Sequence, residues 1–325
     1  MLVGIELGLI YALLALGVYL TFRILDFPDL TVDQSFTTGA ATAAMMMVHG
    51  GSNPLLAMLA AFVVGALAGI ITGLLHTKGG INPLLAGILT MLGLYSINLR
   101  IMGNQANVPL LGTETIFTWM GPYARTWVSI LILLVVVLVI KLILDWFLST
   151  DLGLALQATG NNESMVRSFG VSTDTMKIIG LAVSNGLVGL CGAVVAQSQG
   201  SADISMGIGL ILVGLASVIL GQALFGQRNV FIATTAVVVG SILYRLAIQG
   251  ALELGLNPND MRLISALIVI AALLLPKLKI VRRLRRKREI NADPSGPVQP
   301  MPEHLPSEHT AGTAPRATSQ EGHRA

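Results

Sequence analysis

A series of long apolar segments, separated by short polar breaks, most constrains what this chain can fold into. Nine segments are predicted, at about residues 3–22, 35–49, 54–75, 83–102, 127–148, 178–198, 206–224, 230–249 and 261–280. An α-helix needs about 20 residues to cross a hydrocarbon layer about 30 Å thick. Only 11% of the residues are charged, against about 25% in an average soluble domain. We therefore expect an all-α fold, a polytopic transmembrane helical bundle of about 8–10 spans. Because segments 35–49 and 206–224 are the shortest, we expect some of the helices to be discontinuous.

The basic residues predict how such a bundle is oriented. Of the 20 Lys and Arg residues, ten lie after residue 276, and eight of these form one run, Lys277, Lys279, Arg282, Arg283, Arg285, Arg286, Lys287 and Arg288. Basic residues beside membrane spans are concentrated on the cytoplasmic side. This rule places the C-terminus and the polar loop 149–177 in the cytoplasm and the N-terminus outside. A basic run beside a span favours anionic lipid near Arg282–Arg288 over nucleic acid.

The chain divides by composition into a membrane domain and a tail. Residues 1–280 hold all the apolar segments, with the cytoplasmic loop 149–177 within them. Residues 281–325 begin with the basic run and continue with Pro, Ser, Thr, Glu and His and almost no large apolar residues. Such a composition cannot offset the entropy of ordering, so the tail is expected to be disordered.

Carboxylates near membrane depth are the residues most suggestive of a transport path. Asp29 and Asp33 precede one small-residue span and Asp203 precedes another. Charged groups at such depth are costly and mark functional sites, but carboxylates at helix ends also cap helices. Both interpretations stay open for Asp29, Thr31, Asp33, Asp203 and Ser205, with helix starts expected just after Asp33 and Asp203. The matching stretches 29–33 and 203–207 would fit an inverted repeat.

Motifs for catalysis are missing from the sequence. It contains no G-x-x-x-x-G-K-[ST] phosphate loop, no H-E-x-x-H and no G-x-S-x-G. A single cysteine, Cys191, lies in an apolar segment, so neither a disulfide nor a Cys-based metal site can form within one chain. We expect no enzyme, no catalytic residue, no metal site and no cofactor bound by this chain.

The loop 149–177 carries the most informative pattern. It predicts two short helices with a polar turn at Gly160-Asn161-Asn162, where the first helix breaks and Asn162 can cap the second. Gly170 is expected to end the second helix. One helical face is predicted to contain Leu152, Ala155, Leu156 and Thr159. A short amphipathic element of this kind suits a groove on a partner protein.

This loop resembles the coupling loop of permeases from ABC importers of the branched-chain amino acid and ribose type. The usual form in that family is G-x-x-x-R-A-x-G-x-N-x-x-x-A-x-x-x-G-[IV], and the matching positions here are Gly153, Ala158, Gly160, Asn162, Gly170 and Val171. Gln157 stands where the family has Arg, and Val166 where it has Ala. The stretches 8–17 and 22–33 are similar to a subfamily labelled uncharacterised or as tryptophan/tyrosine uptake permeases. The resemblance covers about residues 4–280 and is most specific at 8–39 and 151–200.

The resemblance implies a type II importer permease in the plasma membrane of a bacterium. Two copies would flank one path, two separate ABC ATP-binding subunits would hold ATP and magnesium, and an extracytoplasmic solute-binding protein would deliver the solute. The residues that would couple to the ATP-binding subunit are Leu152, Gly153, Ala155, Leu156, Gln157, Ala158, Gly160, Asn162 and Glu163. The subfamily label favours an amino acid, an aromatic one in particular. Branched-chain amino acids, nucleosides and sugars stay open as substrates, and an ion-coupled secondary transporter is the alternative function.

Overall fold

Helices make up nearly all of the regular structure in this chain. The computed structural model describes residues 2–123, 126–226, 229–253, 263, 265–267 and 270. The elements are α1 (Leu2–Tyr19), the π-helical turn η1 (Leu20–Ile24), α2 (Thr31–Gly50), α3 (Pro54–Thr77), α4 (Pro83–Ile101), β1 (Asn107–Pro109), α5 (Ile116–Trp119), the 3₁₀ turn η2 (Gly121–Tyr123), α6 (Trp127–Ser149), α7 (Asp151–Asn161), α8 (Glu163–Ser168), α9 (Thr173–Gln199), β2 (Ser201–Asp203), α10 (Leu210–Phe225) and α11 (Val230–Glu253).

The predicted all-α membrane bundle is confirmed. Each of the eight apolar segments that fall on described residues coincides with a helix. Six helices are long and apolar enough to cross a membrane, namely α1 with η1, α3, α4, α6, α9 and α11. The two segments noted as short became α2, which is more polar, and α10, which has 16 residues. Segment 261–280, the tail 281–325 and the run Arg282–Arg288 lie outside the continuously described residues.

Local capping explains where α3 and α4 begin. Each starts with proline at its first position, Pro54 and Pro83, directly after an asparagine. Asn53 accepts a hydrogen bond from the Leu55 amide at 2.9 Å, and Asn82 accepts one from the amide of the second residue after it at 3.0 Å. Proline is favoured here because the first amides of a helix have no partner within the helix.

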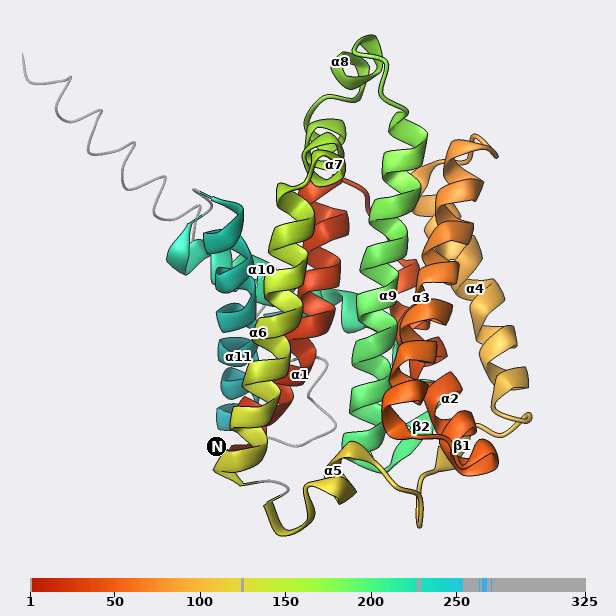
Figure 1. The fold of residues 1–325 in the computed structure, drawn as a ribbon, viewed down its shortest axis with the longest axis vertical. Helices are drawn as coiled ribbons and strands as arrows, with labels where there is room; N and C mark the ends of the chain where they lie inside the picture. Colours follow the sequence, from red (N-terminus) through yellow and green to blue (C-terminus); the bar gives the residue numbers. More distant parts are fainter. Residues whose placement is uncertain are drawn as a thin grey trace, which may run out of the picture. The chain divides into compact units, whose positions relative to one another are not determined.

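Helix α9 forms the centre of the bundle, packing against α1, α2 and α3 (Figure 1). Glycines allow the main chains to touch. A Cβ at Gly39 of α2 would overlap the main chain of Gly189 in α9, and one at Gly65 of α3 would lie 3.2 Å from the Gly189 Cα. Small residues at helix contacts permit this close approach in membranes. Helices α4 and α6 instead expose large apolar side chains along much of their length.

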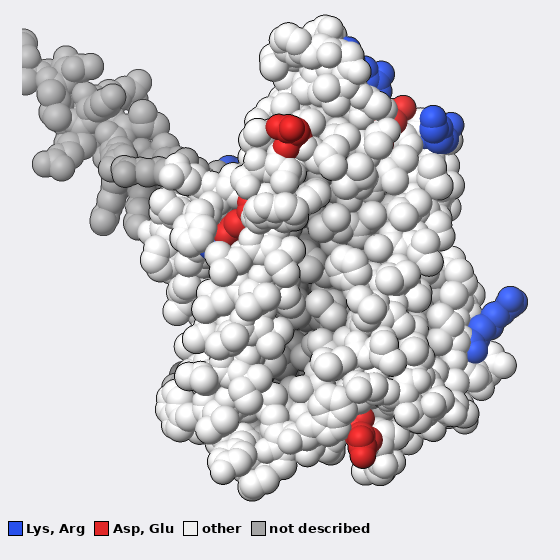
Figure 2. Space-filling view, viewed as in Figure 1, with Lys and Arg blue, Asp and Glu red and all other residues white. Residues whose placement is uncertain are grey.

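The two ends of the bundle carry different structures. Helices α7 and α8 lie at one end, which we call the loop face, while α5, β1 and β2 lie at the other, which we call the hairpin face (Figure 1). Strands β1 and β2 pair antiparallel, with Asn107 opposite Asp203. The first residues of α1 also lie toward the hairpin face. Between the two ends, the surface over α6, α9 and α3 is almost free of charged side chains, as a lipid-facing belt requires (Figure 2).

Candidate functional site

The Asp29 carboxylate is fully buried where α2 begins. Its Oδ1 accepts a hydrogen bond from the Thr31 amide at 2.9 Å, and its Oδ2 accepts one from Asn185 Nδ2 of α9 at 2.7 Å. Ser35 Oγ donates to Asn185 Oδ1 at 2.7 Å, and the Thr31 and Thr72 hydroxyls are 2.7 Å apart. These bonds satisfy a buried carboxyl group and join α2, α3 and α9 through one polar chain.

Asp33 caps a helix, but a different one from the helix expected. Helix α2 begins at Thr31, so the prediction of a helix start just after Asp33 was wrong. The Asp33 carboxylate, in the first turn of α2, accepts hydrogen bonds from the amides of Gly209 and Ile211, both at 2.8 Å. Ile211 lies in the first turn of α10 and Gly209 is the residue before it, and amides at the start of a helix have no carbonyl partner within the helix. The carboxylate also faces the positive end of that helix.

Asp203 does not start a helix either. It ends β2, and α10 begins only at Leu210 after a series of turns. Asp203 Oδ1 accepts a hydrogen bond from the Ser205 amide at 2.8 Å, and the Ser205 hydroxyl also donates to this carboxylate, holding the pKa of Asp203 below its usual value. Within these turns, Gly207 packs against the Asp33 carbonyl with no room for a Cβ. Among the residues that the structure describes, no hydrogen bond joins Asp203 to Asp29.

Helix α7 packs more tightly on the bundle than its pattern predicts. The buried residues are Gly153, Leu156 and Thr159, whereas Leu152, expected on the same face, is 51% exposed. The predicted break at Gly160-Asn161-Asn162 is confirmed, because α7 ends at Asn161 and α8 begins at Glu163. Gly160 lies against the Ile24 carbonyl of η1, where a Cβ would overlap it, so the glycine serves close packing rather than helix termination.

Gln157, where the resembling family has Arg, connects α7 to the end of α6. Its Nε2 donates to the Leu148 carbonyl at 2.8 Å, and that carbonyl belongs to the last turn of α6. Carbonyls in the last turn have no partner within the helix, so this bond satisfies one of them. The remaining expected coupling residues, Ala155 and Ala158, are half-buried in α7.

Helix α8 begins as predicted, with Asn162 as its cap. Asn162 Oδ1 accepts a hydrogen bond from the Met165 amide at 3.0 Å. The helix ends at Ser168, and Gly170 follows with φ 81°, the left-handed conformation expected after a helix.

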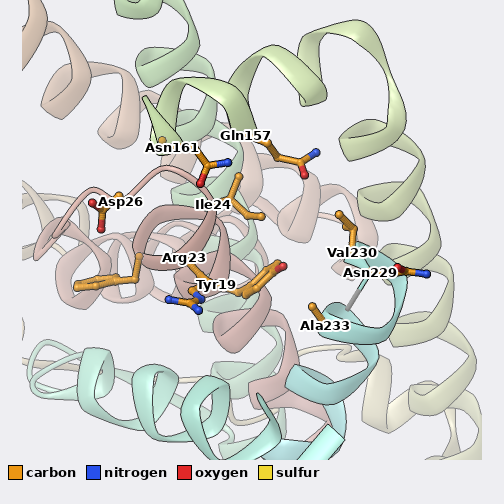
Figure 3. A pocket seen from close by; sticks show the side chains of 11 residues that line it. Tyr19, Arg23, Ile24, Asp26, Gln157, Asn161, Asn229, Val230 and Ala233 are labelled. Carbon is orange, nitrogen blue, oxygen red and sulfur yellow. The ribbon is translucent and has the colours of Figure 1, made fainter. Parts of the chain in front are cut away.

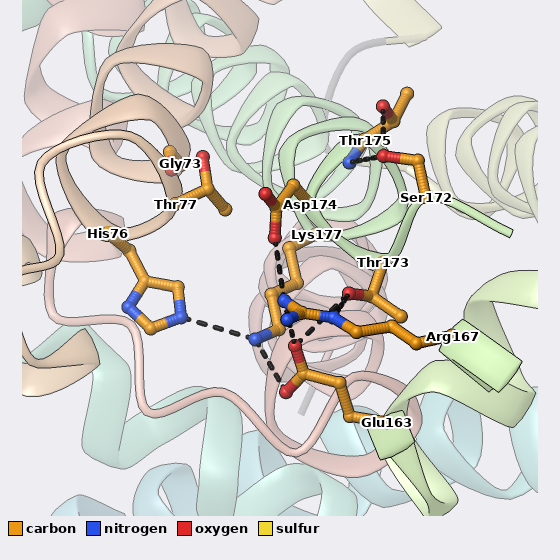
Figure 4. A network of polar contacts seen from close by, with 10 residues as sticks. All are labelled: Gly73, His76, Thr77, Glu163, Arg167, Ser172, Thr173, Asp174, Thr175 and Lys177. Carbon is orange, nitrogen blue, oxygen red and sulfur yellow. Dashed lines mark hydrogen bonds and ion pairs between the residues drawn. The ribbon is translucent and has the colours of Figure 1, made fainter. Parts of the chain in front are cut away.

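A polar network fixes α8 to the start of α9 (Figure 4). Glu163 Oε2 lies 2.8 Å from Lys177 Nζ, and its Oε1 lies 3.0 Å from Arg167 Nη2. Arg167 also pairs with Asp174 at 3.1 Å and donates from Nε to the Thr173 hydroxyl at 2.8 Å. The bond from Lys177 is the largest of several influences that hold the pKa of Glu163 below its usual value.

The same network reaches α3 through His76. The Lys177 ammonium lies 3.3 Å from His76 Nε2, and His76 Nδ1 lies 2.8 Å from the Ile81 carbonyl. A carbonyl can only accept, so Nδ1 carries the proton and Nε2 accepts from Lys177. The ends of α3, α8 and α9 are therefore tied together at the loop face.

A cleft of about 590 Å³ opens between η1, α7 and the start of α11 (Figure 3). It is lined by Tyr19, Phe22, Arg23, Ile24, Asp26, Gln157, Gly160, Asn161, Asn229, Val230 and Ala233. Most of its polar groups come from residues that the sequence did not single out. It lies beside α7, so changes in the position of that helix must change its shape.

Comparison with known proteins identifies the family. The profile of the family described as "Branched-chain amino acid transport system / permease component" matches residues 1–274. The chain belongs to this permease family. It is 41% identical over 292 residues to the tyrosine transport system permease protein of Clostridioides difficile, covering 87% of this chain and 96% of that relative.

Two further relatives show the breadth of the family. An uncharacterized protein of Rickettsia prowazekii is 34% identical over 83% of this chain and 95% of its own length. The ribose import permease protein of Escherichia coli is 25% identical over 82% of each chain. No solved structure matches the chain significantly. This permease is thus a multi-pass membrane transport component, as the sequence predicted.

Proposed function

We propose that this permease is the membrane-spanning subunit of an ATP-driven importer for an amino acid, tyrosine or a close analogue. The observation that carries the coupling part is the network centred on Glu163. It fixes a protruding helix, α8, to two membrane-spanning helices, α9 and α3. An element held this way moves with those helices, which is what a lever for an ATP-binding subunit requires.

The proposal includes an orientation. The loop face lies in the cytoplasm and the hairpin face outside, in the plasma membrane of a bacterium, with the C-terminus on the cytoplasmic side. The positive-inside argument from the run at residues 277–288 supports it. ABC ATP-binding subunits then dock on α7 and α8, an extracytoplasmic solute-binding protein docks on the hairpin face, and a second copy of the permease completes the path.

A continuous route links the lever to the candidate path. The partner's closure on ATP displaces α7 and α8. Lys177 transmits this displacement to α9, which carries Asn185 and its bond to Asp29. Asp33, in the first turn of α2 and four residues after Asp29, accepts hydrogen bonds from the Gly209 and Ile211 amides at the start of α10. Movement of α9 against α2 therefore changes the support of a helix that begins inside the bundle, and the path opens to the opposite side.

The substrate class rests on the relatives. The tyrosine transport permease is the more similar at 41% identity, whereas the ribose import permease is 25% identical. This difference favours an amino acid over a sugar, and nucleosides or sugars are the competing substrates.

The experiment is reconstitution of the full complex in proteoliposomes with the candidate ATP-binding and solute-binding proteins. ATP-dependent uptake of labelled tyrosine is expected in the wild type. Glu163→Ala should abolish substrate-stimulated ATPase activity, while Asp151→Ala should retain it. Asp151 is an exposed acid in the first turn of α7, and no hydrogen bond or ion pair in the network of Glu163 involves it.

Two outcomes would overturn the proposal. Uptake driven by an ion gradient without ATP would make the protein an ion-coupled secondary transporter. ATP-dependent uptake of ribose or a nucleoside, with no competition from amino acids, would keep the importer and reject the substrate class.

A further inference from the structure

The chain adopts unusual backbone conformations where it lines the cleft beside α7. Helix α1 ends in the π-helical turn η1, which carries Arg23. Two residues after η1, Asp26 has φ 52°, a left-handed conformation that residues other than glycine seldom adopt. π-Turns and strained residues concentrate at functional sites. Both features here place a charged side chain at the same cleft.

Opposite helix ends meet across this cleft. Helix α7 ends at Asn161, so its partly negative C-terminal end faces the cleft, while α11 begins at Val230 and presents a partly positive N-terminal end. Figure 3 shows Asp26, Asn161 and Arg23 toward one side of the view and Asn229 and Val230 toward the other. The partly positive start of α11 therefore lies across the cleft from Asp26 and the end of α7, and Arg23 lies on the side of Asp26.

We propose that this cleft binds a free α-amino acid as its zwitterion. The carboxylate lies between Arg23 and the start of α11, and the ammonium group lies between Asp26 and the end of α7. The guanidinium has five N–H donors in a geometry that matches a carboxylate. Tyr19 and Phe22 supply aromatic lining for the side chain. The volume of about 590 Å³ falls in the range of small-molecule sites.

The position gives the site a consequence for transport. A ligand here contacts η1, α7 and α11 together, so it binds the arrangement in which α7 rests on η1. A ligand that prefers one arrangement raises its population. The amino acid that accumulates on the loop face would thus slow the next cycle. The ligand class rests on the proposed function, in which the transported solute is an amino acid.

Equilibrium dialysis on the purified full-length permease tests the proposal with three labelled probes. These are L-tyrosine, tyramine, which lacks the carboxylate, and 3-(4-hydroxyphenyl)propionate, which lacks the ammonium group. Arg23→Gln should weaken binding of the two probes that carry a carboxylate, L-tyrosine and 3-(4-hydroxyphenyl)propionate, by about tenfold to a hundredfold and leave the binding of tyramine unchanged. Asp26→Asn should weaken binding only of the two probes that carry an ammonium group, L-tyrosine and tyramine. Asparagine tolerates the left-handed conformation at position 26, so this variant should keep its backbone.

Matched controls separate recognition from general disturbance. Arg100→Gln in α4 and Asp151→Asn in α7 make the same chemical changes outside the cleft and should bind all three probes as the wild type does. If Arg23→Gln does not fold, Asn229→Asp serves instead, because Asn229 is exposed and the added charge should repel the carboxylate probes.

Unchanged binding in Arg23→Gln and Asp26→Asn would overturn the proposal, as would an equal loss of all three probes. Transport in proteoliposomes keeps the two proposals apart. Normal tyrosine uptake with no Arg23-dependent binding rejects the cleft alone. The expected binding pattern without ATP-driven uptake rejects the proposed function and leaves the cleft as an amino acid site.

Discussion

Gly160→Ala tests whether α7 must rest directly on η1. A Cβ at this position would overlap the Ile24 carbonyl oxygen and lie 2.9 Å from the Ile24 carbonyl carbon and 3.0 Å from the Leu25 carbonyl carbon. Carbon atoms in contact prefer about 3.5–4.0 Å and the carbonyl oxygen is closer still, so the two main chains must separate by about 1 Å or more. The added methyl group therefore pushes α7 away from η1.

The size of the effect follows from two opposing contributions. Overpacking costs about 1–3 kcal/mol, and an overlap with main-chain atoms, which cannot move aside as a side chain can, falls in the upper part of that range, about 2–3 kcal/mol. Alanine favours a helix over glycine by about 0.8–1.0 kcal/mol. The docked position of α7 should therefore lose about 1–2 kcal/mol, which raises the undocked fraction by about 5- to 30-fold.

Hydrogen exchange measured by mass spectrometry reports this fraction directly. Peptides from α7 should exchange about 5- to 30-fold faster in Gly160→Ala than in the wild type, because exchange follows local opening. Peptides from α2 and α9 should be unchanged. Gly93→Ala is the control, since Gly93 lies in α4 and a Cβ there meets nothing within 4 Å. Exchange in α7 that is as slow in Gly160→Ala as in Gly93→Ala would refute the packing argument.

Three further changes test other contacts. The fold lowers the pKa of Glu163, so this residue stabilises the protein at pH values above its ordinary pKa of 4.5, and the stabilisation is lost as the pH falls through the lowered pKa of the folded state. The Tm measured between pH 7 and 3 should therefore depend less on pH in Glu163→Gln than in the wild type. An equal dependence in both proteins would contradict the role of Lys177. Lys141→Met removes the ammonium group that lies 2.7 Å from the Asp145 carboxylate, whose side chain is only 12% exposed, and should lower the free energy of unfolding by about 3–5 kcal/mol. The double variant Lys141→Met with Asp145→Leu should recover most of this loss. No recovery would argue against a buried, unpaired charge as the cause. Asp33→Ala leaves the first amides of α10 without acceptors and should cost about 0.5–2 kcal/mol, seen as faster exchange at residues 209–211 with α7 unaffected.

Local sequence determined the helices and several of their ends. Apolar length alone predicted the segments that became α1, α3, α4, α6, α9 and α11. The cap at Asn162 and the end at Gly170 were also readable, because a cap and the amide it satisfies lie within three residues of each other. The loop motif around Gly153 and Asn162 likewise indicated the family, because its residues lie close together in the sequence.

Only the tertiary structure decided what the buried carboxylates do. Asp33 looked like the cap of the next helix, yet its partners are Gly209 and Ile211, more than 170 residues away. The bond between Lys177 and His76 likewise joins helices 101 residues apart in sequence. Such pairs leave no periodic signal. Side-chain type and spacing specify which groups need partners, but which helix supplies the partner depends on how the glycine contacts bring α2, α3 and α9 together.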